Sequence, residues 1–417
     1  MDVIKKVFND PVQFNTLYGD ALSDLTKGYG FMLGFDNDPS DETSHHDLDV
    51  YMTCYALMPD VRAFKEYSTY FKEHVYKRLK KKVDSANGTK ASLTYVDLAT
   101  EVIIPVCTQW ACEKIYGLEL SKDESLEKEL EDHFKNFLNI FGVVFNKGPV
   151  DKQKAKETSE ALSRVIEDRI KRAKAEIHKK AQEGWSEFFT RVLLEYAIGR
   201  PLPASTNYSF LDQLIKANHS TIGRFPLVAS LKSMKPFLEP LPDDKAFTRK
   251  IGKERLEQAR LASNTLAFAV VAAVNYAQAC LYVLDYYLTN PDRLKELQGK
   301  HEQDHAEFMK YCHEALRLNQ PLFLSRRANL GEGKDMDLSG MKVKHNDIVY
   351  ANLWTVHQTL PKEEFDVGKE GKMHSLYGVG FHRCPASKFV KEVSLTSPPI
   401  VVVDINHPDD ARGMNTL

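Results

Sequence analysis

The cysteine-containing loop near the carboxyl end is the stretch whose residue types point most clearly to chemistry. It reads SLYGVGFHRCPASKFVKE, with Gly378 and Gly380 ahead of His382 and Cys384. Glycines lack a side chain, so the backbone can approach a flat ligand closely and leave amide N–H groups pointing at the Cys384 sulfur. Such donors, together with a metal ion, keep a sulfur deprotonated at neutral pH. The loop therefore predicts a metal-bound thiolate at the start of a helix.

Two charged motifs precede this loop. Glu314 and Arg317 are three residues apart, so they share one face of a predicted helix. On a protein surface such a pair contributes little to stability. The motif SRR at Ser325 to Arg327 follows in an extended stretch, where a guanidinium group can bind a carboxylate in bidentate fashion.

Helical periodicity dominates the elements that must position these residues. Amphipathic or surface helices are predicted over 61–83, from the candidate caps Thr94 and Asp97 to Gly117, and over 152–180. Strands are predicted from Pro321, from Met341 on both sides of an Asn-Asp turn, and from Pro398. The prediction is a mainly α fold with small β-sheets.

The segment 255–289 is the most distinctive of these helices. It contains no glycine or proline and is apolar on nearly all sides, which is typical of a buried helix, and Asn290-Pro291 then ends it. Its apolar middle carries Asn275, Tyr276 and Gln278. A buried amide needs a hydrogen-bond partner, and that partner is either protein or ligand.

Composition excludes several classes of function. The chain has 417 residues, of which 43% are hydrophobic and 27% charged, and a formal net charge of -2, so neither nucleic acid nor an anionic membrane is indicated as a partner. The start has no apolar core of signal-peptide length, and polar residues interrupt the most apolar segment, so we expect neither a signal nor a membrane anchor. The six cysteines form no CxxC pair, which indicates a reducing compartment, and we expect a cytoplasmic protein.

Three other features have simple structural interpretations. His45 and His46 with Asp47 and Asp49 suggest a metal site, but a solvated loop is the favoured reading because adjacent histidines point in different directions. Trp110 is expected in the core. The lysine runs 77–82 and 171–180 are expected to be solvated helix faces.

A Glu-x-x-Arg motif about seventy residues before a G-x-G-x-H-x-C loop, with a long buried helix before both, resembles the cytochrome P-450 superfamily. The resemblance implies one haem-thiolate domain over 1–417, a mainly α fold with small β-sheets, and the long central buried helix lying over haem b. It also implies that Cys384 is the axial ligand of the haem iron and that Glu314 and Arg317 brace the proximal core. The other cofactor-binding residues that it implies are His382 and either Arg326 or Arg327 at the haem propionates, with Gly378, Gly380 and Phe381 in the loop.

A finer resemblance rests on YGVGFHRC and VNYAQA, with YGFMLGFDND near Tyr29 and the stretch that begins YVDLATEV at Tyr95. These segments look like the haem-thiolate domain of fungal fatty-acid dioxygenase fusions, the linoleate diol synthases and allene oxide synthases. That branch makes oxylipins by isomerising or dehydrating fatty-acid hydroperoxides without external electrons. The resemblance therefore implies a lipophilic substrate, such as a fatty-acid hydroperoxide, and a separate dioxygenase that supplies it.

The central helix departs from the pattern of ordinary monooxygenases of the superfamily. Those enzymes carry an acid and then a threonine above the haem, where this chain has Asn275 and Tyr276. An amide donates hydrogen bonds but does not readily deliver a proton. A hydroperoxide removes the difficulty, because it brings both oxygens and the oxidising equivalents. By the resemblance, Asn275 and Gln278 face the hydroperoxide, and together with Tyr276 they are the candidate catalytic residues.

Two further departures keep other functions open. No arginine lies between Pro361 and Ser375, where the family has one that joins the Glu-Arg pair, and His374 or Lys372 are the candidates to replace it. Only 33 residues follow Cys384, so the hairpin that closes the substrate pocket is expected to be shortened after about residue 395. The alternatives are a reductase-dependent monooxygenase of secondary metabolism and a diverged haem protein with non-oxidative chemistry. The monooxygenase would use Arg383, Lys388 and Lys391 as a docking patch for its reductase.

Overall fold

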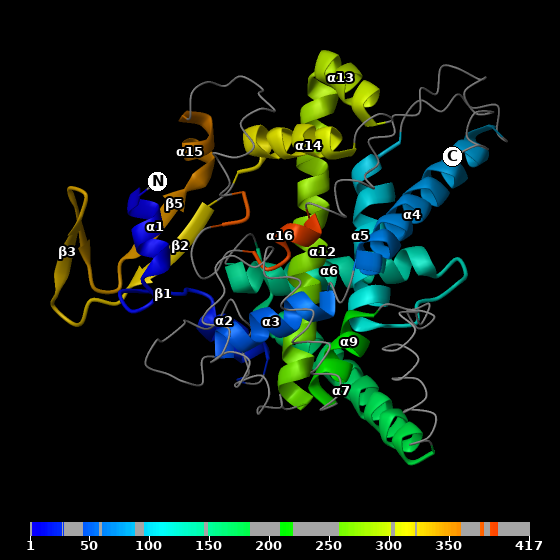
Figure 1. Cartoon of the computed structure of the whole chain (residues 1–417), viewed down its shortest axis with the longest axis horizontal. Coiled ribbons are helices and arrows are strands. Elements are labelled where there is room, and N and C mark those ends of the chain that lie inside the picture. Colours follow the sequence, from blue (N-terminus) through cyan, green and yellow to red (C-terminus); the bar gives the residue numbers. More distant parts are fainter. Residues whose placement is uncertain are drawn as a thin grey trace, which may run out of the picture.

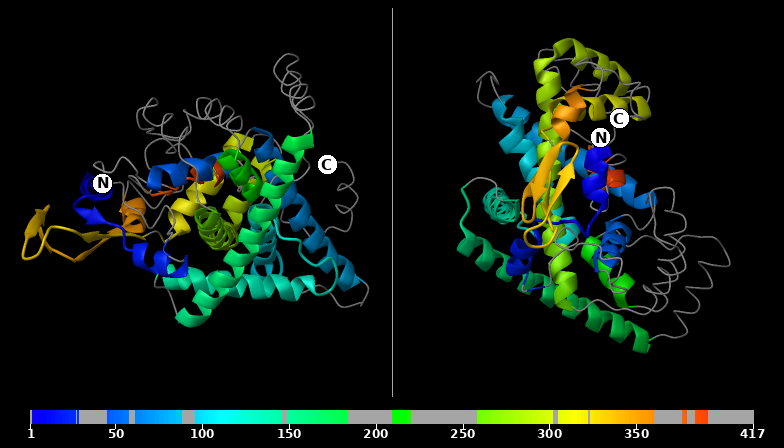
Figure 2. Two further views of the ribbon diagram at one scale, coloured as in Figure 1. Left: turned by 90° about the horizontal axis from the view of Figure 1, so that it is seen from below. Right: turned by 90° about the vertical axis from the view of Figure 1, so that its left-hand side faces the viewer.

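The computed structural model describes residues 2–26, 28, 45–57, 61–87, 96–145, 149–183, 209–219, 258–301, 305–321, 323–359, 376–378 and 384–390. In these residues helices predominate, and one long helix, α12 (Gln258–Thr289), passes through the middle of the molecule with the others around it (Figure 1). Two small sheets lie to one side, and the left view of Figure 2 shows the same separation. The mainly α prediction is confirmed.

The other elements are helices of 3 to 32 residues and strands of 2 to 6 residues. The helices are α1 (Asp2–Asn9), α2 (Gly19–Leu25), α3 (His45–Leu57), α4 (Val61–Asn87), η2 (Ala99–Ile103), α5 (Ile104–Trp110), η3 (Ala111–Tyr116), α6 (Leu126–Phe145), α7 (Lys152–Glu183), α9 (Phe210–His219), α13 (Pro291–His301), α14 (His305–Asn319), α15 (Leu353–Thr359) and α16 (Ser387–Phe389). The strands are β1 (Phe14–Asn15), β2 (Phe323–Ala328), β3 (Asp335–Leu338), β4 (Met341–Lys344) and β5 (Ile348–Asn352).

Helix α12 confirms the prediction of a long buried helix. Its 32 residues span about 48 Å at about 1.5 Å per residue. It ends at Thr289, and α13 begins at Pro291, because proline fits a first helical turn. By length and composition α12 is long and apolar enough to cross a membrane, but 67% of its most apolar stretch is buried inside the protein. The core of the protein therefore accounts for its apolar sequence.

The segment 98–116 confirms the predicted helix from Asp97 to Gly117. Asp97 accepts hydrogen bonds from the Ala99 and Thr100 backbone N–H groups at 3.0 and 3.1 Å, so its carboxylate caps the first turn. Pro105 lies where the wider π-turns of η2 give way to α5. Gly117 ends the helix in the left-handed conformation, with φ of +65°.

The strand predictions from Pro321 and Met341 are confirmed, with one difference in pairing. β4 and β5 both form, but β5 pairs with β2 in the three-stranded sheet β1-β2-β5, whereas β4 pairs with β3. The β3–β4 hairpin turns at Ser339 and Gly340, which both have positive φ, as a two-residue hairpin turn of the I′ type requires. β1 and β3 were not predicted, and the strand expected from Pro398 lies outside the described residues.

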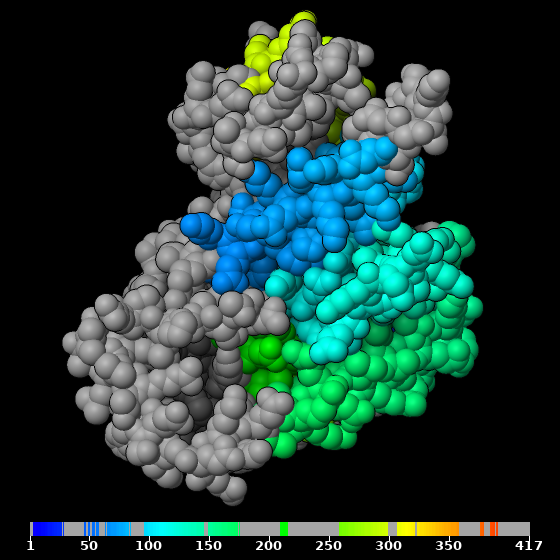
Figure 3. Space-filling model, turned by 90° about the vertical axis from the view of Figure 1, so that its right-hand side faces the viewer, coloured from blue at the N-terminus to red at the C-terminus, as the bar shows by residue number. Residues whose placement is uncertain are grey.

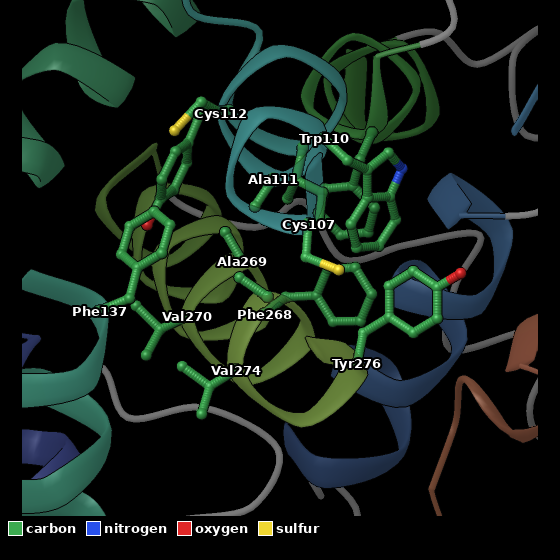
Figure 4. Packing of buried hydrophobic residues seen from close by; sticks show 14 of the residues in the cluster. Cys107, Trp110, Ala111, Cys112, Phe137, Phe268, Ala269, Val270, Val274 and Tyr276 are labelled. Carbon is green, nitrogen blue, oxygen red and sulfur yellow. The ribbon is translucent and has the colours of Figure 1, made fainter. Parts of the chain in front are cut away.

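The largest part of the core lies between α12 and the helices α4, α5 and α6. Figure 4 shows Trp110 beside Cys107 from α5, with Phe268 and Tyr276 of α12 on the other side. Trp110 is buried, as expected. The lysine-rich helices α4 and α7 lie on the surface, where they form much of the face in Figure 3, and Lys77 and Lys171 are exposed. The expectation of solvated faces is confirmed for these two residues.

The expectation for the histidine pair is wrong, because His45 and His46 begin helix α3 instead of a solvated loop. His46 and Asp49 are buried, and Asp49 accepts hydrogen bonds from Arg260 Nε at 3.1 Å and Nη2 at 3.0 Å. Asn264 Nδ2 donates to the same carboxylate oxygen at 2.8 Å. Asp49 therefore contacts α12, and the buried ion pair with Arg260 removes the need for solvent.

Candidate functional site

Cys384 stands just before α16 and is partly buried. Its backbone N–H donates to the Tyr377 carbonyl at 2.7 Å, and its own carbonyl accepts from the Ser387 N–H at 3.1 Å. Gly378 is buried with φ of +80°, a conformation that a residue with a Cβ adopts only with strain. The close turn ahead of the cysteine is therefore present. Gly380, Phe381, His382 and Arg383 lie outside the described residues.

A second cysteine, Cys54 of α3, contacts the cysteine loop. The Cys54 thiol donates to the Pro385 carbonyl at 3.5 Å, and Cys54 is completely buried. Burial, followed by the neighbouring Cys384, raises the pKa of the Cys54 thiol to about 12. Cys54 is therefore a protonated donor at neutral pH, beside a cysteine predicted to be a thiolate. Sequence spacing gives no signal for this contact, which joins residues 331 positions apart.

Aromatic rings connect α16 to the central helix. The Phe389 ring stacks on Trp110, with centroids 5.3 Å apart, and meets Tyr67 edge-on at 5.3 Å. Trp110 in turn contacts Tyr276 at 5.9 Å. Such ring pairs stabilise a fixed arrangement beyond the area that they bury. The cysteine loop and the middle of α12 are thereby held at a defined distance.

Asn275 is the one exposed residue between Gln258 and Leu284 of α12. Val271, Ala272 and Gln278 are partly buried beside it, so these four residues form an accessible stripe along an otherwise buried helix. Residues three and four apart share a helix face. The structure therefore brings Asn275 and Gln278 together, as expected, but it does not bury Asn275 in the core.

Tyr276 lies on a different side of α12. It is buried, and its ring packs edge-on against Phe71 at 4.8 Å and Trp110 at 5.9 Å. Successive helical residues are about 100° apart, so neighbours in sequence face different surroundings. Figure 4 shows the Tyr276 ring in this aromatic group. The structure therefore does not bring Tyr276 together with Asn275, and its ring contacts support a packing role, while its predicted part in catalysis stays a prediction.

Glu314 and Arg317 form a buried, bidentate ion pair on α14. Arg317 Nε donates to Glu314 Oε2 at 2.7 Å and Nη2 donates to Oε1 at 2.5 Å, with side-chain exposures of only 7% and 4% for Glu314 and Arg317. The remaining arm of the guanidinium, Nη1, donates to the His357 carbonyl of α15 at 2.6 Å. A backbone carbonyl thus contacts the pair from α15. His374 and Lys372, the candidates for a third side chain, lie outside the described residues.

The two arginines of β2 have different surroundings. Arg326 is buried, and its guanidinium lies over the Phe8 ring at 4.9 Å, a cation–π contact. Arg327 is exposed and pairs in register with Asn15 of β1 and Ile348 of β5. A buried arginine is already desolvated, so it binds an anion more strongly than an exposed one does. Arg326 is the better candidate for a buried carboxylate ligand.

The single thiol of Cys384 fits a haem iron, because the porphyrin ring supplies the other ligands of that ion. In the part of the chain that the structure describes, no group of three or more His, Cys, Asp or Glu residues is placed to hold a metal ion. A bare structural zinc ion needs about four protein ligands, whereas haem iron needs a protein ligand only along its axis. One partly buried thiol after a left-handed glycine therefore suits haem, with Arg326 as a candidate partner for a propionate.

No protein-family model and no curated protein matches the sequence. Solved structures match it over 95% of its length. One is P450BioI in complex with a hexadec-9Z-enoic acid ligated acyl carrier protein, at 13% identity and a TM-score of 0.56 over 81% of that chain. Another is a Tepidiphilus thermophilus P450 haem domain, at 14% identity and a TM-score of 0.53 over 78% of that chain.

A third similar structure is the LnmA cytochrome P450 hydroxylase from the leinamycin biosynthetic pathway of Streptomyces atroolivaceus. It is 14% identical, with a TM-score of 0.54 over 79% of that chain. Identities this low establish the fold alone. The chain has the cytochrome P-450 fold, with α12 as its central helix.

Proposed function

We propose that this chain is a haem-thiolate enzyme that rearranges a lipid hydroperoxide, such as a fatty-acid hydroperoxide, to a diol, an epoxy alcohol or an allene oxide. The proposal assigns haem b to the chain, with Cys384 as axial ligand and Arg326 at a propionate. The loop residues Gly380, Phe381 and His382 complete the proposed cofactor site. The likeness to a P450 haem domain supports the cofactor assignment.

The accessible stripe of α12 carries the proposal for the reaction. Its residues are Val271, Ala272, Asn275 and Gln278, which include no carboxyl and no hydroxyl group. A monooxygenase would need a side chain that delivers a proton at this point, and an amide is a poor source of one. A hydroperoxide needs no external electrons, because the oxidising equivalents are already in the substrate.

The residues of the chain have separate parts in this reaction. When bound, haem supplies the one-electron chemistry that opens a peroxide bond. The Asn275 amide donates a hydrogen bond to the hydroperoxide and orients it, and Gln278 supports the same group from one turn further along. Val271 and Ala272 present apolar surface, which keeps water away from the reacting carbon. Tyr276 holds this part of α12 against α4 and α5 through its ring contacts.

The second candidate is a monooxygenase that receives electrons from a reductase. The likeness to a P450 hydroxylase favours it. The two candidates differ in their need for electrons, so turnover with and without NADPH and a reductase separates them. Turnover that depends strictly on the reductase supports the monooxygenase, and turnover of a hydroperoxide by the purified ferric protein alone supports the isomerase.

The substitution Asn275→Leu tests the stripe directly. Loss of the amide hydrogen bond is expected to slow hydroperoxide conversion about tenfold, equivalent to about 1.4 kcal/mol, or to change the ratio of products. The haem spectrum should stay unchanged, because Asn275 is exposed and its replacement leaves no cavity in the core. Product ratios are measured by liquid chromatography and mass spectrometry. Tyr276→Phe, which keeps the ring packing, is the matched control, and identical products and rates from Asn275→Leu would exclude the proposed role.

A further inference from the structure

A buried polar cluster lies where α3 meets the first turns of α12. It consists of His46, Asp49 and Thr53 on α3 with Arg260 and Asn264 on α12, all of them buried. On α3 the three residues are spaced three and four apart, so they share one face. Among the described residues no group of three or more His, Cys, Asp or Glu side chains is placed to hold a metal ion, so the cluster does not form the metal site that the sequence analysis disfavoured.

Three atoms of this cluster have no hydrogen-bond partner. The Asp49 carboxylate receives all its hydrogen bonds from Arg260 and Asn264 at Oδ1, which leaves Oδ2 without one. Asn264 donates through Nδ2 and leaves Oδ1 unpaired, and Thr53 Oγ1 is unpaired one turn along α3. The exposed fractions are 0% for Asp49 and 1% for Thr53 and Asn264. Buried polar atoms without partners are rare in native proteins because each costs free energy, so these three atoms call for a partner that the described residues do not supply.

The cluster lies on the same face of α12 as the proposed reaction site. Asn264 and Asn275 are eleven residues apart, which is close to three full turns, so their side chains leave the helix in nearly the same direction. The separation along the axis is about 16 Å. An elongated lipid that reaches both Asn275 and the cluster would pass Phe268, which is buried and stacks on Phe210 of α9.

The chemistry of the unpaired atoms selects the group that they bind. Asn264 Oδ1 only accepts hydrogen bonds, and Thr53 Oγ1 donates or accepts. Burial raises the pKa of the Asp49 carboxyl, although Arg260 and Asn264 lower it. A hydroxyl group both donates and accepts, so it pairs with Asp49 Oδ2 in either protonation state. A ligand carboxylate only accepts hydrogen bonds, so it would leave Asn264 Oδ1 unpaired and would repel Asp49 in its ionised form.

We propose that Asp49, Thr53 and Asn264 form a second substrate-binding subsite, which takes a neutral hydroxyl group on the lipid about 16 Å along α12 from Asn275. This inference rests on the proposed function for its substrate class, a lipid hydroperoxide that also carries a hydroxyl group. The three residues determine specificity and take no part in the reaction of the peroxide. Arg260 positions Asp49 through the two hydrogen bonds to Oδ1.

The test measures binding of three probes of one chain length to the full chain loaded with haem, by isothermal titration calorimetry. The probes are a long-chain primary alcohol, its methyl ether and the corresponding fatty acid. The ether keeps the oxygen but lacks the O–H donor. The alcohol is expected to bind about tenfold more tightly than the ether, equivalent to about 1.4 kcal/mol, and more tightly than the fatty acid.

Thr53→Val and Asn264→Leu should each bring the affinities for the alcohol and the ether close together. Thr265→Val is the matched control, because Thr265 is equally buried and adjacent to Asn264, but its hydroxyl already donates to the Leu261 carbonyl of the same helix. That variant should keep the preference for the alcohol. Thr53→Val nearly preserves side-chain volume, so circular dichroism should report an intact fold.

An alcohol that binds no better than the ether to the unsubstituted protein overturns the subsite. So does a preference that survives both Thr53→Val and Asn264→Leu, which would mean that the cluster pairs internally or with water. The measurement needs no turnover, so its result is separate from that of the peroxide assay. Failure to convert hydroperoxides contradicts the proposed function, whereas equal affinities contradict only the subsite.

Discussion

Cys384→Ala is expected to abolish the conversion of fatty-acid hydroperoxides and to remove the red-shifted Soret band that the ferrous carbon monoxide complex of a haem-thiolate protein shows. The thiolate is the proposed protein bond to the iron, and no other side chain among the described residues forms a metal-binding group with it. Because Cys384 is only partly buried, its truncation creates little cavity. The loss should therefore occur in a folded protein.

Cys112→Ala is the matched control for this experiment. Cys112 is buried in the core on η3, and burial raises the pKa of its thiol well above the ordinary range, so it stays a protonated, inert thiol. Its removal should cost some stability while keeping the red-shifted band and the activity. A Cys384→Ala protein that retains both the band and the turnover would assign the iron ligand to another residue.

Glu314→Gln is expected to lower the free energy of unfolding by about 3–5 kcal/mol, because it removes the negative charge that Glu314 places against the buried Arg317 guanidinium. Both side chains are almost wholly buried, and two short hydrogen bonds join them. Gln offers one acceptor oxygen in place of a bidentate carboxylate. The His357 carbonyl contact on the other arm does not neutralise the charge. Denaturant unfolding at neutral pH measures the change.

As a control, the chain offers an exposed ion pair whose two residues are also three positions apart. Arg293 Nη1 donates to Glu296 Oε2 at 2.8 Å across three residues of α13, with side-chain exposures of 41% and 44%. Water screens this pair, so Glu296→Gln should change the free energy of unfolding by less than about 1 kcal/mol. Equal effects from the two substitutions would show that burial of the Glu314–Arg317 pair has no energetic consequence.

Local sequence signals predicted the elements that depend on neighbours in the chain. The capping carboxylate of Asp97 and the left-handed Gly117 mark the ends of one helix, and both act within a few residues. The absence of glycine and proline through α12, with apolar residues on nearly all sides, likewise identifies a core helix from its own composition. These features can be identified from the sequence without knowing which other elements pack against them.

Other parts of the site depend on contacts that the local sequence does not encode. The polar run at His46 and Asp49 resembled a solvated loop, because its partner Arg260 is 211 residues away. The hydrogen bond from Cys54 to Pro385 joins equally distant segments. Asn275 looked buried from its apolar neighbours in sequence, yet it is exposed, since helix packing leaves that stripe of α12 accessible. Strand β3 was missed, although the Ser339–Gly340 pair that follows it is a hairpin-turn signal, as its positive φ values show.

The likeness in fold and the resemblance in sequence support different parts of the account. The solved structures at 13 to 14% identity establish the cytochrome P-450 fold. The hydroperoxide reaction rests on the amide residues of the α12 stripe and on the resemblance to fungal fatty-acid dioxygenase fusions. A separate dioxygenase that supplies the hydroperoxide belongs to the same proposal.

The most direct test of the central claim is product analysis of the purified ferric protein mixed with a panel of fatty-acid hydroperoxides, without NADPH or a reductase. Liquid chromatography and mass spectrometry identify the products, and isotopically labelled hydroperoxide oxygen shows their origin. The account predicts rapid formation of diols, epoxy alcohols or a ketol derived from an allene oxide, with label retained in the diols and epoxy alcohols. No conversion by a protein that still shows a thiolate-ligated haem spectrum would contradict the proposed reaction.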